Sequence, residues 1–188
     1  MAGAQLLECA WRAGAGQNSR IHCVGDGAGW IVRQVEERFS GRANYLIDFY
    51  HVSEYLAKAA EVISGAPQRW RSRQQPRLKS NRVGKVIEEL RGHLEEEEGE
   101  GEAAPVRACL RYLSERLANL DYKGAIEAGL PIGSGEIESG NWGVIQARLK
   151  RSGAWWKEEN AENMLALRSR RASGEWQSYW DALWQVAA

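Results

Sequence analysis

A strand–helix–strand pattern near the N-terminus restricts the fold of this chain more than any other feature. A short β-branched run ends at Asp26 ("RIHCVGD"), and a second strand-like run ends near Asp48 ("NYLIDFYH"). Between them, "WIVRQVEERF" places Ile31, Val35 and Phe39 at helical spacing, with charged residues on the opposite face. This order predicts a βαβ unit whose two strands are parallel.

The remainder of the chain has helical patterns. A short helix and a glycine-rich turn are expected over residues 1–17, and no strand pattern is convincing between Glu54 and Ala128. A glycine-punctuated loop and a tryptophan-rich helical tail follow. We therefore expect an α/β fold that is mostly α-helical. The amphipathic segments are "SEYLAKAAEVI", "RVGKVIEELRGHLEEEE" and "VRACLRYLSERLANL", the last with apolar positions at Val106, Leu110, Leu113 and Leu117.

Charge is distributed in blocks, although 25 Lys+Arg balance 25 Asp+Glu. A basic block spans residues 68–93, an acidic run follows at 94–102, and "EGEGEAAP" at 98–105 is the best linker candidate. A neutral protein with basic blocks binds polyanions through local patches. Packing does not call for so many arginines, so we expect the block to bind phosphates. Its candidate cations are Arg69, Arg71, Arg73, Arg77, Lys79 and Arg82.

The three cysteines argue against an oxidising compartment. Cys9, Cys23 and Cys109 are scattered and odd in number, so neither a disulfide framework nor a cysteine zinc site is supported. No apolar run approaches the length of a membrane span, and the N-terminus lacks the order of a signal peptide. We expect a soluble, cytoplasmic protein with no membrane partner.

The acidic candidates each have a structural alternative when taken singly. Asp26 lies in "GDGAGW", where Asp-Gly is a common turn pair and no phosphate-loop motif is present. Asp48 is placed to cap the next helix. Glu138 lies in "GSGEIES", where Ser134 fits an N-cap and Glu138 the first helical turn. The two aspartates nevertheless fall where parallel strands end, which is where open α/β sheets carry their chemistry.

In their order along the chain, these motifs resemble the DDE transposases of bacterial insertion sequences. The similarity is closest to the ISKra-type group, which is related to the Mutator-like transposases. It rests on "GDGAGWI", "LIDFYHVSEYL", "LDYKGAIEAGLPIGSGEIESGNWGVIQARLKRSGAWW" and "NMLALRSRRASGEWQSYW". The resemblance implies an RNase H-like core with three acidic residues that bind two divalent metals, Mg²⁺ or Mn²⁺. Asp26 matches the second acid, Glu138 the third, and Asp48 with His51 a C/D-x-x-H element.

The resemblance also implies a domain organisation. Residues 1–51 would form part of the catalytic core, residues 52–128 a helical insertion, and residues 129–188 the end of the core with its tail. The family's first catalytic aspartate lies upstream of "GDGA", and only Glu8 is acidic before Asp26. We therefore expect a C-terminal part of a transposase, truncated at its N-terminus. A catalytically inactive DNA-binding or regulatory remnant is the alternative.

The chemistry of phosphodiester transfer agrees with this assignment. Two Mg²⁺ ions stabilise charge on the attacking and leaving oxygens, and hard cations favour carboxylates over thiols. Asp26 and Glu138 therefore suit metal ligands better than acid–base residues. His51 either orients the scissile phosphate or a ligand, or is a structural histidine. An unrelated α/β metal-dependent phosphoesterase is a third hypothesis.

DNA is the expected partner, bound by a homo-oligomer. Beside the basic block, "QARLKRSGAWW" offers cations for phosphates and indoles for stacking on an unpaired base or wedging a duplex end. The spacing of Trp176, Trp180 and Trp184 favours a core or an interface instead. Trp155 and Trp156 remain open between packing and DNA contact. The candidate contacts in this segment are Arg148, Lys150, Arg151, Trp155 and Trp156.

Overall fold

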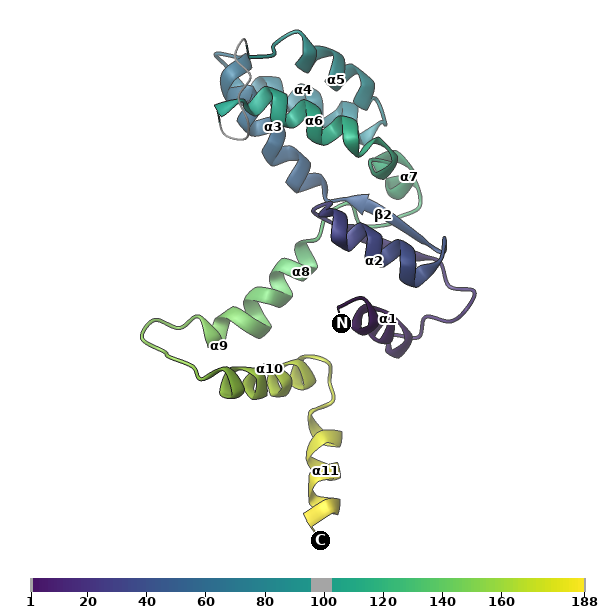
Figure 1. Ribbon diagram of the computed structural model, residues 1–188, viewed down its shortest axis with the longest axis vertical. Coiled ribbons are helices and arrows are strands. Elements are labelled where there is room, and N and C mark those ends of the chain that lie inside the picture. The colour runs from purple at the N-terminus through teal and green to yellow at the C-terminus, as the bar shows by residue number, and fades with distance from the viewer. Residues whose placement is uncertain (1, 96–102, 188) are drawn as a thin grey trace. The chain divides into compact units, whose positions relative to one another are not determined.

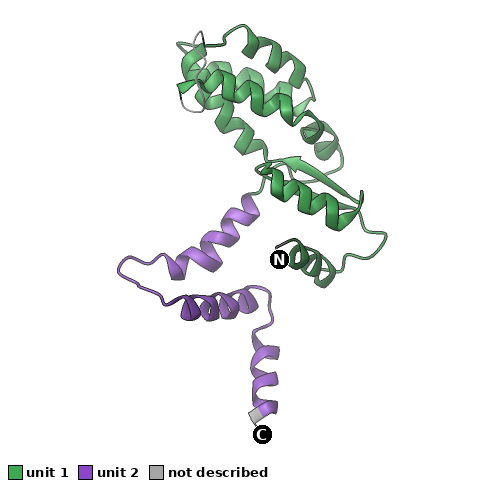
Figure 2. Ribbon diagram, in the orientation of Figure 1, with its two compact units in different colours: residues 1–134 green, residues 135–188 purple. Residues whose placement is uncertain are grey.

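The computed structural model describes residues 2–95 and 103–187. It separates into two compact units, residues 1–134 and 135–188 (Figure 2). Most described residues are helical, and the strands form a two-stranded sheet (Figure 1). The predicted mostly helical α/β class is therefore confirmed. No helix within the described ranges is long and apolar enough to cross a membrane.

The predicted βαβ unit is present in the first unit. The strands are parallel, with Ile21 opposite Ala43 and Gly25 opposite Ile47. The connecting helix buries Val35 and Phe39, as its spacing predicts, because these residues face the sheet. An N-terminal helix packs against this connecting helix. The elements are α1 (Ala2–Arg12), β1 (Ile21–Gly25), α2 (Gly29–Phe39) and β2 (Ala43–Ile47).

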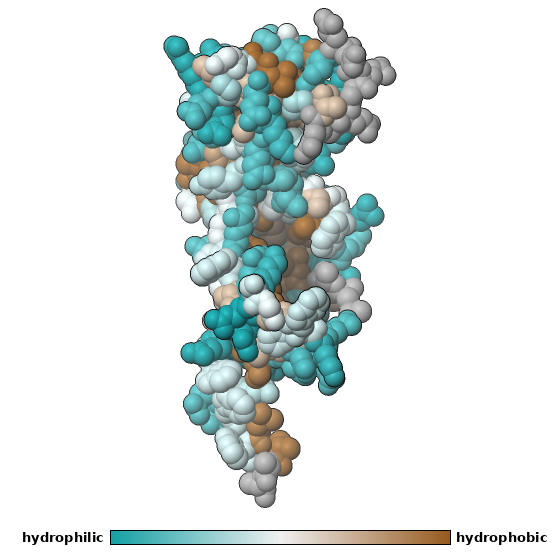
Figure 3. Space-filling view, turned by 90° about the vertical axis from the view of Figure 1, so that its left-hand side faces the viewer, coloured by the Kyte–Doolittle hydropathy of each residue, from teal (hydrophilic) through white to brown (hydrophobic). Residues whose placement is uncertain are grey.

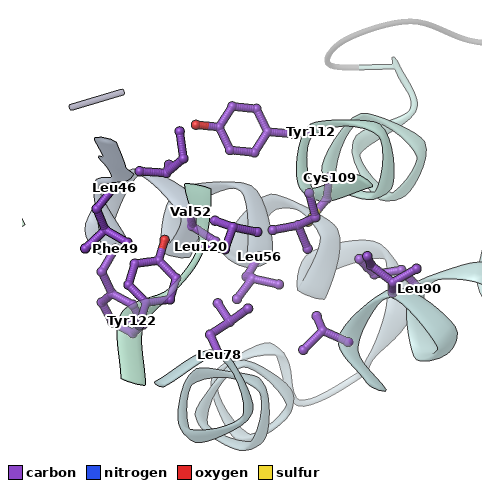
Figure 4. Packing of buried hydrophobic residues seen from close by; sticks show 14 of the residues in the cluster. Leu46, Phe49, Val52, Leu56, Leu78, Leu90, Cys109, Tyr112, Leu120 and Tyr122 are labelled. Atoms are coloured by element: carbon purple, nitrogen blue, oxygen red, sulfur yellow. The ribbon is translucent and has the colours of Figure 1, made fainter. Parts of the chain in front are cut away.

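A group of helices continues from β2 and shares one hydrophobic core with the βαβ unit (Figure 4). Helix α3 packs against both α4 and α6, and α5 packs against α4 and α6. Leu56 of α3 and Leu113 of α6 are fully buried in this core. The elements are α3 (Phe49–Ile63), α4 (Pro67–Lys79), α5 (Val83–Arg91), α6 (Pro105–Glu115), η2 (Leu117–Asn119) and α7 (Tyr122–Glu127).

Helix α4 forms although Pro76 lies inside it and most of its residues are polar. An internal proline removes a backbone hydrogen bond and disfavours a helix. Here Trp70, Gln74 and Leu78, at four-residue intervals, are all buried, so packing of this stripe stabilises the helix against the proline. The Trp70 indole N–H also donates to Glu89 Oε1 of α5 at 2.7 Å.

The prediction that Leu117 belongs to the apolar face of α6 is wrong. Helix α6 ends at Glu115, and Leu117 begins a 3₁₀ turn in which its side chain is 50% exposed. Val106 and Leu113 are buried as predicted, and Leu110 is half-buried. The face is lost because the helix ends before Leu117: Arg116, with φ −122° and ψ 19°, is not helical and redirects the chain.

The linker candidate at 98–105 and the acidic run at 94–102 lie largely outside the described residues. At the described end of that run, the Glu95 carboxylate accepts the backbone N–H groups of Val106 (2.7 Å) and Arg107 (3.0 Å). Glu95 thereby caps the first turn of α6 from outside the helix, since its oxygens replace the missing intrahelical acceptors.

In the second unit, a π-helical segment joins two α-helical pieces. A π turn leaves carbonyl oxygens without their usual donors, and such segments are frequent at functional sites. The Arg168 guanidinium, from the helix that contacts this segment, donates to the carbonyls of Val144 and Gly143. The elements are α8 (Gly135–Gly140), η3 (Asn141–Gln146), α9 (Ala147–Leu149), α10 (Glu158–Ala172) and α11 (Trp176–Ala187).

The tryptophans of α11 do not form a buried stripe. Trp176 and Trp180 meet edge to face at 5.4 Å, whereas the Trp184 side chain is 71% exposed. None of residues 135–186 is buried. Apolar side chains gather at the surface near the C-terminal end (brown in Figure 3). The spacing that favoured a core therefore produces only a local aromatic contact within this unit.

Candidate functional site

Asp26 and Asp48 directly follow the two parallel strands at the same edge of the sheet. Gly25 pairs with Ile47, and the Asp48 backbone N–H donates to the Gly25 carbonyl at 2.7 Å. The strand-end placement predicted from the sequence is thus confirmed. The two carboxylates have different surroundings, however, because Asp26 is exposed and Asp48 is buried.

The Asp26 side chain has one intramolecular role. Its Oδ1 accepts the Ala28 backbone N–H at 2.9 Å, which is the hydrogen bond of an Asx turn. Its Oδ2 has no hydrogen-bond partner within the described residues. Asp26 is therefore a turn residue that still presents a carboxylate oxygen to the surface.

Three side chains from distant parts of the chain hold the backbone of this turn. Tyr112 donates its hydroxyl to the Asp26 carbonyl at 2.6 Å, and its O–H is directed from α6 toward the sheet (Figure 4). Tyr45 accepts the Gly27 N–H at 3.2 Å, and Arg116 donates to the Gly27 carbonyl at 3.4 Å. Burial raises the pKa of Tyr112, so its hydroxyl stays protonated and remains a donor.

Gly27 is required at the centre of this arrangement. Its φ is +77°, in the left-handed region, and an added Cβ would lie 2.4 Å from Ile47 Cδ1. A Cβ there would also come within 3.2 Å of both the Tyr112 hydroxyl and Arg116 Nε. Both the backbone conformation and the close packing therefore exclude a larger residue.

Replacing Gly27 by alanine is expected to lower the free energy of unfolding by about 2–3 kcal/mol, from left-handed strain plus displacement of Ile47. Gly29 is the matched control, because its φ is not positive and an added Cβ meets nothing within 4 Å. Gly29→Ala should leave stability unchanged or raise it by up to about 1 kcal/mol. Urea unfolding monitored by circular dichroism measures the free energy of unfolding of both variants. An equal loss in Gly27→Ala and Gly29→Ala would contradict the packing described.

Asp48 is fully occupied as a structural carboxylate. It is 5% exposed, and Oδ1 accepts the backbone N–H groups of Tyr50 (2.6 Å) and His51 (3.3 Å), which caps α3. Its Oδ2 accepts the backbone N–H of Ser134 at 2.6 Å and also the Ser134 hydroxyl. With four donors on two oxygens, Asp48 has little capacity left for a metal ion.

The pKa of Asp48 reflects this environment. Burial raises it, but the hydrogen bonds from Ser134, Tyr50 and His51 outweigh burial, so the pKa lies below its ordinary value. A depressed pKa contributes stability that is present above the unfolded-state pKa, about 3.9, and is lost as the pH falls through the lower folded-state value.

Asp48→Asn is expected to lower the free energy of unfolding by about 2 kcal/mol at pH 7, because the amide nitrogen cannot accept the donors of one carboxylate oxygen. The difference from the unsubstituted protein should shrink as the pH falls from about 4, where the unfolded-state carboxyl takes up a proton, through the lower pKa of the folded-state carboxyl. Urea unfolding at pH 7, 5 and 3 measures this trend. A difference that stays constant over this range would contradict it.

The segment before α8 is anchored at the same sheet edge by more than Asp48. The Phe49 backbone N–H donates to the Ile132 carbonyl at 2.8 Å, and the His22 ring nitrogen lies 2.8 Å from the Pro131 carbonyl oxygen. Ser134 directly precedes α8, where an N-cap was expected, but its hydroxyl donates to Asp48. Ser134, the last residue of the first unit, is therefore fixed at this edge of the sheet.

Glu138 lies in the first turn of α8, in the second unit, and is exposed. The two predicted metal ligands thus come from different units. Among the described residues, no group of three or more His, Cys, Asp or Glu side chains is arranged to hold a metal ion. The donor chemistry of Asp26 and Glu138 suits Mg²⁺, since both present exposed carboxylates.

His51 lines a groove between α3 and α6. The groove has a volume of about 550 Å³. The His51 ring meets Tyr55 and Tyr112 edge to face, and its Nδ1 lies 3.7 Å from Glu54 Oε2. The main polar and aromatic side chains lining it are His51, Glu54, Tyr55 and Lys58 from α3, Arg111, Tyr112 and Glu115 from α6, and Arg116 directly after α6.

Part of the predicted basic patch on α4 has structural partners. Arg77 forms an ion pair with Glu89, and Arg73 lies 3.4 Å from the same carboxylate. Lys79 Nζ lies 4.7 Å from the centre of the Phe49 ring. The expectation that packing does not need these arginines is therefore wrong for Arg77, because its charge balances Glu89 beside buried Trp70.

The remaining candidates of the basic patch have fewer contacts with the rest of the described chain. Arg69 is exposed and Arg71 half-buried, and neither has an ion-pair partner in the described part of the chain. Arg82 is exposed and donates to the Ser80 hydroxyl at 3.2 Å. These cations retain the exposure that phosphate binding requires.

In the second unit, Trp155 and Trp156 differ in how much of each side chain is exposed. Trp155 is 97% exposed, which fits a contact with a partner better than a core position. Trp156 is half-buried, and the Arg148 guanidinium lies 5.2 Å from its ring centre. Lys150 and Arg151 are exposed beside them.

Sequence reasoning missed the residues that hold the Asp26 turn. Tyr112 is 86 positions from Asp26 and Arg116 is 89 positions from Gly27, so no local motif connects them. Ser134 is likewise 86 positions from Asp48. The sequence shows only that polar side chains lie on the amphipathic helix around Tyr112. Every surface helix has such side chains, so they do not indicate a contact with Asp26.

Residues 13–181 match the sequence profile of an uncharacterised protein family, UPF0236. No curated protein and no solved structure matches the chain significantly. Because the matched segment runs through β1, both aspartates and most of the second unit, it covers nearly the whole chain. The protein is therefore a member of the uncharacterised family UPF0236.

Proposed function

We propose that this chain is a catalytic part of a DDE-type transposase, which cleaves and joins DNA strands during insertion-sequence transposition. The observation that carries the proposal is that Asp26 combines a fixed backbone with an exposed carboxylate. Its backbone is held by Tyr45, Tyr112 and Arg116, while its carboxylate stays exposed at the carboxyl edge of a parallel strand pair. An acid held rigidly and left open to solvent is what a metal-dependent site requires.

Asp26 and Glu138 would hold the divalent metals of this site, Mg²⁺ or Mn²⁺. When bound, a metal pair stabilises charge on the attacking and leaving oxygens of a phosphodiester. Asp48 would instead anchor Ser134, from which the chain continues into α8 and Glu138. Within the proposal, the βαβ unit is part of an RNase H-like core, and α3 to α7 form its helical insertion.

A strand-cleavage assay tests the proposal. Supercoiled plasmid or an insertion-sequence end is incubated with the protein and Mg²⁺ or Mn²⁺, with EDTA in a parallel reaction. We expect nicked product that requires the metal and accumulates with protein concentration. Absence of metal-dependent nicking with both ions, on DNA that the protein binds, would overturn the catalytic proposal.

A second candidate function is DNA binding without cleavage, as in a regulatory remnant of a transposase. Exposed Arg69 and neighbouring Arg71, which have no ion-pair partner among the described residues, favour binding but say nothing of catalysis. DNA bound with no metal-dependent nicking would select this candidate. On either function, assembly as a homo-oligomer on DNA is part of the proposal.

The contribution of α4 to DNA binding is measurable by salt dependence. The double variant Arg69→Ala/Arg71→Ala is expected to reduce the slope of log affinity against log salt by about 1–2. Lys123→Ala is the matched control, because Lys123 is exposed on α7 but lies 3.6 Å from Glu127. Fluorescence anisotropy at several salt concentrations measures both; an unchanged slope in the double variant would exclude these phosphate contacts.

A further inference from the structure

The groove between α3 and α6 is joined to the Asp26 turn through two side chains. Tyr112 and Arg116 line the groove and also hold the carbonyls of Asp26 and Gly27. The groove is therefore next to the candidate catalytic carboxylate, within the same compact unit.

The lining of the groove combines aromatic rings with an excess of cations. Tyr55 stacks on Tyr112 at 4.2 Å. Tyr112 is 7% exposed and the Arg116 guanidinium lies 4.4 Å from its ring centre, so half-buried Tyr55 is the ring of this pair that a ligand contacts. Lys58, Arg111 and Arg116 contribute three permanent positive charges, against the carboxylates Glu54 and Glu115. Glu115 is paired with Arg116 at 3.0 Å, whereas exposed Lys58 has no ion-pair partner in the described ranges.

The size of the groove limits what it accepts. About 550 Å³ falls within the range of about 300–1,000 Å³ that is usual for small-ligand pockets. A stacked duplex does not fit a space of that size, but one unpaired nucleotide does. Aromatic side chains bind unpaired bases, and nearby cations bind the phosphate.

We infer that this groove binds a single unpaired nucleotide of the DNA strand at Asp26, an inference that rests on the proposed function. Tyr55, backed by buried Tyr112, contacts the base, and Lys58 binds the adjoining phosphate. His51, at the same wall, faces the bound nucleotide. The helical insertion thereby supplies a specificity site as well as the clamp on Asp26.

Photo-cross-linking tests this site without any need for strand cleavage. The probe is a hairpin duplex with one unpaired 5-iodo-deoxyuridine at its open end, irradiated on the full chain in EDTA. We expect cross-links to Tyr55, identified by mass spectrometry. Cross-links confined to α4 or to Trp155 and Trp156 overturn the inference and leave the proposed function standing. No DNA binding at all overturns both.

Affinity measurements with matched variants provide the second test. Lys58→Glu is expected to weaken binding of the hairpin about tenfold, against at most about twofold for Lys123→Glu on α7. Tyr55→Leu should weaken binding about tenfold when the unpaired position carries a base, and have little effect when it is abasic. Tyr55→Phe should retain binding. Equal losses by Tyr55→Leu on both probes would show a structural role only and overturn the inference.

Discussion

Asp26→Asn is expected to reduce metal-dependent strand cleavage by about three orders of magnitude, with DNA binding retained. Asparagine keeps the oxygen that accepts the Ala28 N–H, so the turn is preserved while the negative charge is lost. A metal ligand contributes several kcal/mol to stabilising the transition state, and each 1.4 kcal/mol is about tenfold in rate. Initial nicking rates in Mg²⁺ measure the effect.

The matched control for this experiment is Asp181→Asn. Asp181 is exposed on α11, and its Oδ1 accepts a hydrogen bond from Gln177 at 2.9 Å, a bond that an asparagine oxygen also accepts. Its replacement should leave the nicking rate within about twofold, since it removes the same charge outside the candidate site. Equal loss in both variants would show that the effect is not specific to the Asp26 site. Full activity of Asp26→Asn would remove Asp26 from the site.

Trp70→Ala is expected to lower the free energy of unfolding by about 3–5 kcal/mol, because it opens a cavity between α4 and α5. Trp70 is 2% exposed, and its indole N–H donates to Glu89. The substitution also leaves Arg77 and Glu89 beside a void, which weakens the ion pair that joins the two helices. Urea unfolding monitored by circular dichroism measures the change.

Trp184→Ala is the control for that experiment, since the same residue type is mostly exposed on α11. Its effect on the free energy of unfolding should stay within about 0.5 kcal/mol. A large loss in Trp184→Ala would show that α11 is buried against a partner in solution. A small loss in Trp70→Ala would mean that α4 does not pack as described.

The βαβ unit was predictable because its signals are local. Alternation of β-branched residues defines β1 and β2, and Val35 with Phe39 defines the buried face of α2. Helix α4 was harder to predict, since arginines and Pro76 mask a stripe of three buried residues. The stripe stabilises α4 only because it packs against α3 and α5, which the sequence of α4 does not reveal.

The candidate site was predictable only in part, for the same reason. Strand ends identify Asp26 and Asp48, and helix-capping rules suggest the structural role that Asp48 has. The partners that distinguish the two aspartates are Tyr112 and Ser134, each 86 positions away. Local sequence patterns carry no information on contacts between residues that lie so far apart in the chain.

The long span between Tyr112 and Asp26 has a consequence for the order of folding. Bringing residues so far apart together costs loop-closure entropy, which contacts made afterwards must offset. The parallel strands close a shorter loop, so the sheet edge is able to form before α6 docks on it. The turn carrying Asp26 is held by Tyr112 only when α6 is in place, so the docking of α6 is also the step that fixes the backbone beside the carboxylate.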